Sequence, residues 1–219
     1  VDRGYLPNLK SATETSLQRK QLDLIQAMNR DLGRQPGAPD QLDGVIESYE
    51  LGFKMQGKVP ELLDISKESQ KVKDAYGAVD GPKGSFARQC IMARRLNEAG
   101  VRFVEICQPG WDHHNNLHKG LIDRCGSVDQ PTGALLADLE QRGLLEDTLV
   151  LFGSEFGRQP TAEYATGSGR DHNSEAFTMW LAGGGIKGGT SIGVTDELGS
   201  APVGAKYHVK NLHATILNQ

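Results

Sequence analysis

The feature that most constrains the fold is a change of pattern near Gly84, where strand-like runs begin to alternate with helical stretches. The apolar spacing over residues 85–99 predicts a helix closed by Gly100, and the run over residues 101–106 predicts a strand. Further along, a helix is predicted over residues 133–142, and strands over 148–152 and 177–182. Alternation of this kind indicates βαβ units. We therefore expect an α/β fold with a parallel-rich sheet sandwiched by helices.

The residues before this change are predicted to form helices. Apolar residues from Leu17 to Leu32 share one helical face, with Gly33 as a stop, and a second helix follows Asp40 as N-cap. Pro60 suits the first turn of another short helix, and residues 69–76 are predicted to form one more. The expected organisation is a helical segment (1–83) that packs on an α/β core (84–219). The chain begins without Met and stops inside a helical pattern, so we expect a fragment of one larger domain.

Composition excludes several classes of partner. The 219 residues carry a net charge of -4, with 24 Lys and Arg against 28 Asp and Glu. This balance gives no basic surface for nucleic acid or for an anionic membrane. The apolar runs are also far shorter than the roughly 20 residues that span a bilayer. We expect a soluble globular protein.

Chemistry-bearing residues gather after or beside the predicted strands. Residues 108–118 follow the first strand, residues 153–158 follow the second, and residues 169–173 precede the third. None of the 6 histidines lies in the first 110 residues. Ligands of open α/β sheets bind at the carboxyl ends of strands, so these clusters predict one shared site.

The first cluster has a metal-ligand composition. Asp112 and His114 are the predicted ligands, one carboxylate and one imidazole. His113 and His118 are second-choice metal ligands. A mixed oxygen and nitrogen set favours Zn, Mn or Fe over Ca or Mg. If the following segment is helical, His114 and His118 share a face at a spacing of four residues. The alternative is a polar loop whose histidines cap helix ends.

The other two clusters pair acidic or imidazole groups with arginine. Glu155 lies at a strand end three residues before Arg158, and His172 follows Arg170. A carboxylate at a strand end with an arginine three residues later, as in Glu155 and Arg158, suits a metal or an anionic oxyester. Local ion pairs within the two loops are the alternative.

The glycine-rich run over residues 183–188 matches the GxGxxG pattern of dinucleotide sites. That fingerprint requires a helix to begin there, so that its amides meet the pyrophosphate. Residues 190–204 are instead rich in turn-forming residues and include Pro202. We expect a tight loop and no dinucleotide cofactor.

Together these motifs resemble a known family. They are Gly-Trp-Asp-x-His, Ser-Glu-Phe-Gly-Arg-x-Pro, Gly-Arg-Asp-His, Ala-Gly-Gly-Gly-Ile-Lys-Gly-Gly and Leu-His-Ala-Thr-Ile-Leu. The set is similar to the sulfatase-like bacterial domain-of-unknown-function family 1501, which is grouped with the alkaline phosphatase-like superfamily. The resemblance is specific from about Gly84 onward and weaker from about Leu17. Such proteins are usually longer at the N-terminus and often carry a twin-arginine export signal, which implies an exported or periplasmic protein.

The resemblance implies a metal-dependent hydrolase of sulfate or phosphate esters, in which Arg158 or Arg170 would clamp a non-bridging oxygen of the ester. One superfamily metal takes an Asp and two His, which match Asp112, His114 and His172. The second takes an Asp-His pair, where this chain has Glu155 and Phe156, so the second metal centre departs from the family pattern. The superfamily nucleophile follows the first strand of the whole domain, and no matching position is found in this chain. The alternative function is a non-catalytic binding module with a degenerate hydrolase fold.

Overall fold

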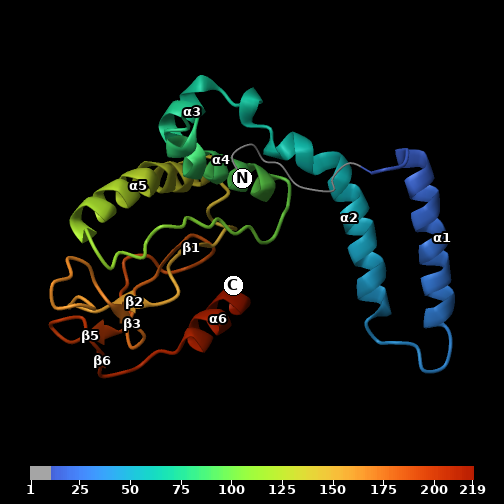
Figure 1. The fold of residues 1–219 in the computed structure, drawn as a ribbon. Helices are drawn as coiled ribbons and strands as arrows, with labels where there is room; N and C mark the ends of the chain where they lie inside the picture. Colours follow the sequence, from blue (N-terminus) through green and yellow to red (C-terminus); the bar gives the residue numbers. More distant parts are fainter. Residues whose placement is uncertain (1–10) are drawn as a thin grey trace. The chain divides into compact units, whose positions relative to one another are not determined.

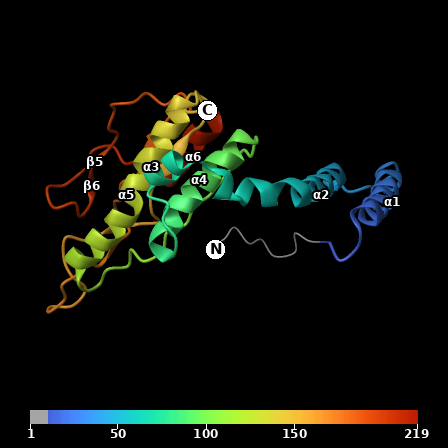
Figure 2. The ribbon, with the colours of Figure 1, turned by 90° about the horizontal axis from the view of Figure 1, so that it is seen from above.

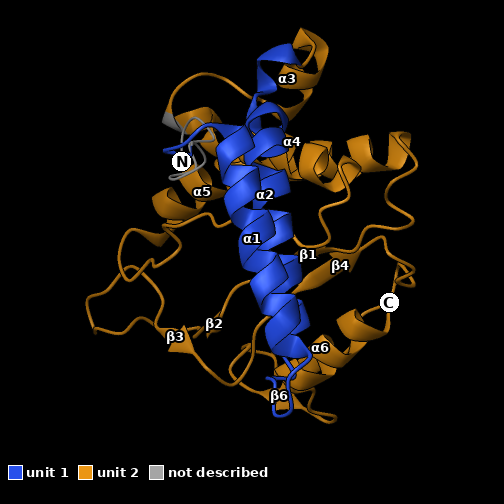
Figure 3. Ribbon diagram, turned by 90° about the vertical axis from the view of Figure 1, so that its right-hand side faces the viewer, with its two compact units in different colours: residues 1–67 blue, residues 68–219 orange. Residues whose placement is uncertain are grey.

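The computed structural model describes residues 11–219. These residues divide into two compact units, one that ends at Lys67 and one that begins at Glu68 (Figure 3). About 49% of the described residues are helical and 7% are in strands. The helices are α1 (Thr15–Gly33), α2 (Leu42–Leu63), α3 (Gln70–Tyr76), α4 (Ser85–Glu98), α5 (Leu117–Gln141) and α6 (Val209–Asn218), with short 3-10 turns η1 (Ile65–Lys67) and η2 (Pro82–Gly84). The strands are β1 (Val150–Phe152), β2 (Gly157–Arg158), β3 (His172–Asn173), β4 (Trp180–Ala182), β5 (Val194–Thr195) and β6 (Pro202–Val203).

The first unit is a hairpin of two helices, α1 and α2, which lie side by side (Figure 1). Arg19 of α1 holds Glu50 of α2 through two hydrogen bonds of 2.8 Å, and the buried Gln26 amide donates to the Ile46 carbonyl at 2.8 Å. The predicted end of the first helix at Gly33 is confirmed. The predicted start of a new helix at Pro60 is wrong, because α2 continues through this residue to Leu63.

The core of the second unit is helical. Helices α3, α4 and α5 pack against one another (Figure 2). Their buried apolar side chains are Tyr76, Phe86, Ala87, Cys90, Ile91, Val128 and Leu139. The predicted helices over residues 69–76 and 85–99 are confirmed: the Ser69 hydroxyl caps α3, and Gly77 ends it with a φ of 68°. The predicted helix over residues 133–142 is the second half of α5, which begins much earlier, at Leu117.

The predicted parallel-rich sheet is wrong. The described strands form three separate antiparallel pairs, β1 with β4, β2 with β3 and β5 with β6. Between β1 and β4 the chain contains loops and the β2–β3 pair but no helix, so the crossover that a parallel pairing requires is missing. The α/β sandwich is therefore replaced by a helical layer with short strand pairs.

The predicted strand over residues 101–106 also does not form. The segment has no ladder partner among the described residues, and the Phe103 side chain is 81% exposed. Alternating apolar residues favour an extended backbone, but a strand is stable only when another strand pairs with it. The segment leads directly into the loop that carries Asp112 and His114.

The division into two units falls after Lys67, whereas the sequence pattern changes near Gly84. Packing of residues 1–83 on a core over residues 84–219, as part of one larger domain, stays a prediction. Among the residues that the structure describes, no helix combines the length and the apolar character needed to cross a membrane.

Candidate metal centre

Two loops of the second unit meet at the site. The first, residues 111–116, precedes α5, and the second, residues 159–171, connects β2 to β3. The Arg170 amide donates to the His113 carbonyl at 2.9 Å, and the Leu117 amide donates to the Ser168 carbonyl at 3.2 Å. The Asn116 amide donates to the Ser168 hydroxyl at 2.8 Å. These backbone contacts set the positions of Asp112 and His114 relative to His172.

The strand pair β2–β3 brings in two more side chains. Arg158 and His172 are directly opposite in the antiparallel register, which places them on the same face of the pair. The Phe156 ring packs against the His172 ring at 4.3 Å between centroids and restricts its orientation. Glycine is required at position 157, because a Cβ there would overlap the Ala176 carbonyl.

Three side chains converge on one point. The Nε2 atoms of His114 and His172 are 3.1 Å apart, and Oδ1 of Asp112 lies 2.9 Å from the first and 3.0 Å from the second. When neither Nε2 carries a proton, two nitrogen lone pairs and one carboxylate oxygen face one another, and a cation between them removes this repulsion. A tetrahedral metal with bonds of about 2.0–2.1 Å would separate its ligands by about 3.3 Å, close to the spacing found here. The arrangement therefore fits a metal ion bound by all three atoms.

Arg158 supplies a positive charge beside this point. Its Nη2 donates to Oδ1 of Asp112 at 2.9 Å and to the Trp111 carbonyl at 3.2 Å, and Nη1 donates to the Arg170 carbonyl at 3.3 Å. Hydrogen bonds from His172 and Arg158 lower the pKa of the Asp112 carboxyl to about 2. Asp112 is thus in the charged form that a metal requires.

The structure brings together Asp112, His114, His172 and Arg158 of the predicted site residues. Glu155 is exposed and belongs to neither of the ligand groups found among the described residues. The His113 ring lies against Gly120 of α5, and His118 is exposed in the first turn of that helix. Since α5 begins at Leu117, the proposed helical spacing of His114 and His118 does not apply. The Arg170 guanidinium donates to the Gly169 carbonyl at 2.8 Å.

Sequence reasoning missed Glu163 and Asp171. Both lie close to His114 and form a second potential ligand group with it. Asp171 adjoins the predicted ligand His172, so its position was a signal that could have been used. Glu163 lies in a loop with no recognisable motif, and only the folded loop brings it to His114.

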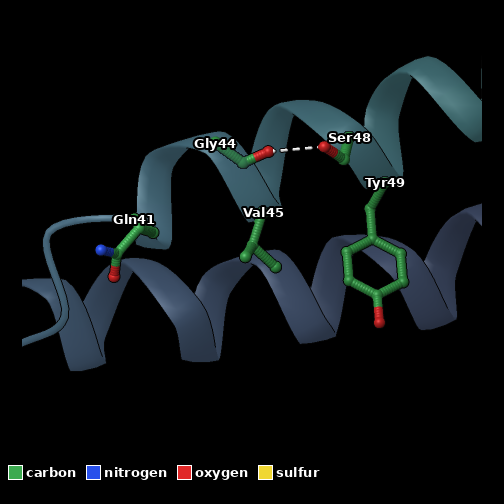
Figure 4. Close-up of a pocket in the computed structure, with 5 residues that line it drawn as sticks. All are labelled: Gln41, Gly44, Val45, Ser48 and Tyr49. Carbon is green, nitrogen blue, oxygen red and sulfur yellow. Dashed lines mark hydrogen bonds between the residues drawn. The ribbon is translucent and has the colours of Figure 1, made fainter. Parts of the chain in front are cut away.

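A surface depression is found on the first unit. It is lined by Gln41, Gly44, Val45, Ser48 and Tyr49 of α2 and its N-terminus. Val45 and Tyr49 extend from α2 toward α1, and the Ser48 hydroxyl donates to the Gly44 carbonyl at 2.7 Å (Figure 4). This depression contains none of the predicted site residues and no metal-ligand group. The convergent side chains of the second unit are the better candidate for chemistry.

Comparison with known protein families identifies the family of this chain. The family described as "Protein of unknown function (DUF1501)" matches residues 6–219. The chain belongs to the DUF1501 family. Neither the curated proteins nor the solved structures contain a match. The match covers all the site residues of this DUF1501 chain.

Proposed function

We propose that this DUF1501 chain binds one divalent metal ion through Asp112, His114 and His172 and uses it to hydrolyse a sulfate or phosphate ester. The observation that carries the proposal is the convergence of the three ligand atoms within 2.9–3.1 Å of one another. Asp112 and His114 belong to one loop, and His172 lies 60 and 58 residues after them in the chain. Such a meeting of distant, unlike donors is typical of a site rather than of a local ion pair.

The donor set indicates the metal. Two imidazoles and one carboxylate suit Zn, Mn or Fe better than Ca or Mg, which prefer oxygen ligands. Three protein ligands leave a coordination position open for substrate or water, as in catalytic rather than structural zinc sites. The metal would act as a Lewis acid on an ester oxygen, while water would attack sulfur or phosphorus and the alcohol would leave.

Arg158 supports the proposed substrate class. Arg158 holds a planar cation beside the ligand atoms, and its fork of N–H donors matches the oxygens of a sulfate or phosphate group. In the proposed reaction Arg158 binds a non-bridging oxygen and stabilises the negative charge that develops during displacement. Arg170 is the second candidate for this role. The alkaline phosphatase-like relationship, which the sequence motifs suggest, is part of the same proposal.

A specific observation favours a second candidate, the non-catalytic binding module. Phe156 occupies the position of the second imidazole in the expected two-metal pattern, and it packs on His172. Glu155 is also outside the cluster. The cluster therefore supports one metal ion and not two. A non-catalytic module could bind an anion through that metal ion and Arg158, without hydrolysing it.

Ester turnover separates the two functions. With zinc or manganese added, the protein is expected to hydrolyse p-nitrophenyl sulfate or p-nitrophenyl phosphate. Alanine at Asp112 or His172 should lower kcat/KM at least about 100-fold by removing a metal ligand. Arg158→Lys should lower it about 10-fold or more, because lysine lacks the bidentate fork. Glu197→Gln, an exposed carboxylate on the β5–β6 hairpin, is the matched control and should change nothing. Metal binding without turnover of either ester would favour the binding module.

A further inference from the structure

The second nitrogen of His114 faces an acidic group that the three-ligand cluster does not use. Oε2 of Glu163 lies 2.8 Å from Nδ1 of His114. This Nδ1 is buried, and it has no aligned hydrogen-bond partner among the described residues, so the contact with Glu163 is an electrostatic one. Buried polar atoms are normally paired, and the Glu163 carboxylate lies within hydrogen-bonding distance of Nδ1.

The charges on the two sides of the ring differ. On the Nε2 side, the Asp112 carboxylate is neutralised by Arg158 at 2.9 Å. On the Nδ1 side, no Lys or Arg forms an ion pair with Glu163 among the described residues. Asp171 adds a second carboxylate to this side. One oxygen of Asp171 accepts a hydrogen bond from the His172 amide at 2.7 Å. The uncompensated negative charge therefore lies on the Nδ1 side.

The loop that carries Glu163 is closed by backbone hydrogen bonds. The Gln159 amide donates to the Asp171 carbonyl at 2.8 Å, and the Asp171 amide donates to the Thr161 carbonyl at 3.0 Å. A tighter turn follows, in which the Gly167 amide donates to the Tyr164 carbonyl at 2.8 Å. These bonds keep Glu163 beside His114 although its side chain is 37% exposed.

We infer that Glu163 is a positioning residue for the metal centre: it keeps the proton of His114 on Nδ1, so that Nε2 presents its lone pair to the metal. A carboxylate acts only as an acceptor when ionised, so it selects the tautomer that has a proton on the facing nitrogen. Carboxylate partners of metal-bound histidines orient the ring and strengthen the ligand in the same way. This inference rests on the proposed function, because its purpose is to prepare His114 as a ligand.

The tautomer of His114 tests the inference without metal. Long-range proton–nitrogen NMR spectra of the metal-free, full chain labelled with nitrogen-15 histidine should show a protonated Nδ1 and a bare Nε2 for His114. The signals are assigned by their loss in His114→Gln. In Glu163→Gln, which keeps the size of the side chain and removes its charge, this preference should fall. The Glu197→Gln spectrum should match the wild type. A bare Nδ1 in the wild type, or an unchanged tautomer in Glu163→Gln, would overturn the inference.

Zinc affinity provides the second readout. Calorimetric titration should show that Glu163→Gln weakens zinc binding about 10- to 100-fold, while Glu197→Gln binds as the wild type does. A zinc-induced shift of Nδ1 instead of Nε2 would place the metal with Glu163 and Asp171, and this would overturn the inference. If the wild-type chain shows the Glu163-dependent tautomer but binds no metal, the proposed function fails while the effect of Glu163 on His114 stands.

Discussion

Replacing Arg94 with alanine is expected to lower the free energy of unfolding of the second unit by about 3 kcal/mol. The Arg94 side chain is 3% exposed and lies at the centre of an ionic network that joins α4, α5 and the segment just before α3. It contacts Glu68 at 2.9 Å, Glu98 at 2.7 Å and Asp138 at 3.1 Å. Asp138 also accepts the hydroxyl proton of the buried Tyr76 at 2.9 Å. Removing the guanidinium leaves partly buried carboxylates with less positive charge around them.

The remaining arginines limit this loss. Arg95 still pairs with Glu68 at 2.7 Å, and Arg142 still pairs with both Glu98 and Asp138 at 2.7 Å. For this reason the expected cost is at the lower end of the roughly 3–5 kcal/mol found when one partner of a buried pair is removed. Urea unfolding followed by circular dichroism measures the effect.

An exposed ion pair on α5 provides the control for Arg94. Lys119 pairs with Asp123, but the Lys119 side chain is 79% exposed. Lys119→Ala should therefore cost less than about 1 kcal/mol. Equal stability losses for Arg94→Ala and Lys119→Ala would show that the Arg94 network contributes no more than a surface pair.

Acid should reduce the advantage of the wild type over Arg94→Ala. Burial alone would raise the pKa of Glu68, but hydrogen bonds from Arg95 and Arg94 outweigh it and lower the pKa below the ordinary value. A carboxylate with a lowered folded-state pKa stabilises the fold above its unfolded-state pKa of about 4.3, and this contribution is lost as pH falls through the folded-state value. The stability difference between the two proteins should be constant near neutral pH and should shrink below about pH 4.

Gly169→Ala is expected to separate the two loops of the site and to weaken metal binding at least about 10-fold. Gly169 is buried, and a Cβ there would overlap the backbone carbonyls of His113 and His114. These atoms are backbone, so they can yield only if the two loops move apart. Such a movement shifts His172, three residues later, relative to His114 and breaks the triangle of ligand atoms. A stability loss of about 1–3 kcal/mol should accompany it.

A second loop glycine, Gly188, provides the control, because it shows whether any glycine-to-alanine change in a loop has the same effect. Gly188 has open space around its Cβ position and no positive φ, so Gly188→Ala should leave stability and zinc affinity unchanged. Calorimetric zinc titration and thermal unfolding of both variants give the comparison. Wild-type zinc affinity in Gly169→Ala would mean that the junction of the two loops does not position the ligands.

The helices could be predicted from the sequence because their signals are local. The apolar faces of α1 and α4, the Ser69 cap and the Gly77 stop each lie within a few residues of the structure they determine. The errors at Pro60 and at the start of α5 concern boundaries. Tertiary packing sets these positions, and it can outweigh the preference of a proline for the first turn.

The sheet could not be predicted in the same way. Alternating or apolar runs show that residues 148–152 and 177–182 are extended, and both contain a strand, β1 and β4. Their direction depends on the connection between them. The sequence pattern predicts parallel strands here. The connection over residues 153–179 instead reverses the direction of the chain, so that β4 pairs with β1 in the antiparallel sense.

The site was predictable to the extent that its ligands belong to motifs. Asp112, His114 and His172 were identified by residue type, and Arg158 by its place after a strand. Glu163 has no such pattern, and its contact with His114 exists only because the loop over residues 159–171 folds back. Glu155, in contrast, lies in a motif but not in the cluster.

The most direct test of the metal centre is the metal content of the protein after purification without chelators, measured by mass spectrometry. About one equivalent of zinc, manganese or iron per chain is expected, because three converging ligands define one site. Asp112→Ala and His172→Ala, folded by circular dichroism, should contain none, while Glu197→Gln should match the wild type. A folded wild-type protein that contains no metal and binds none on titration would contradict the account.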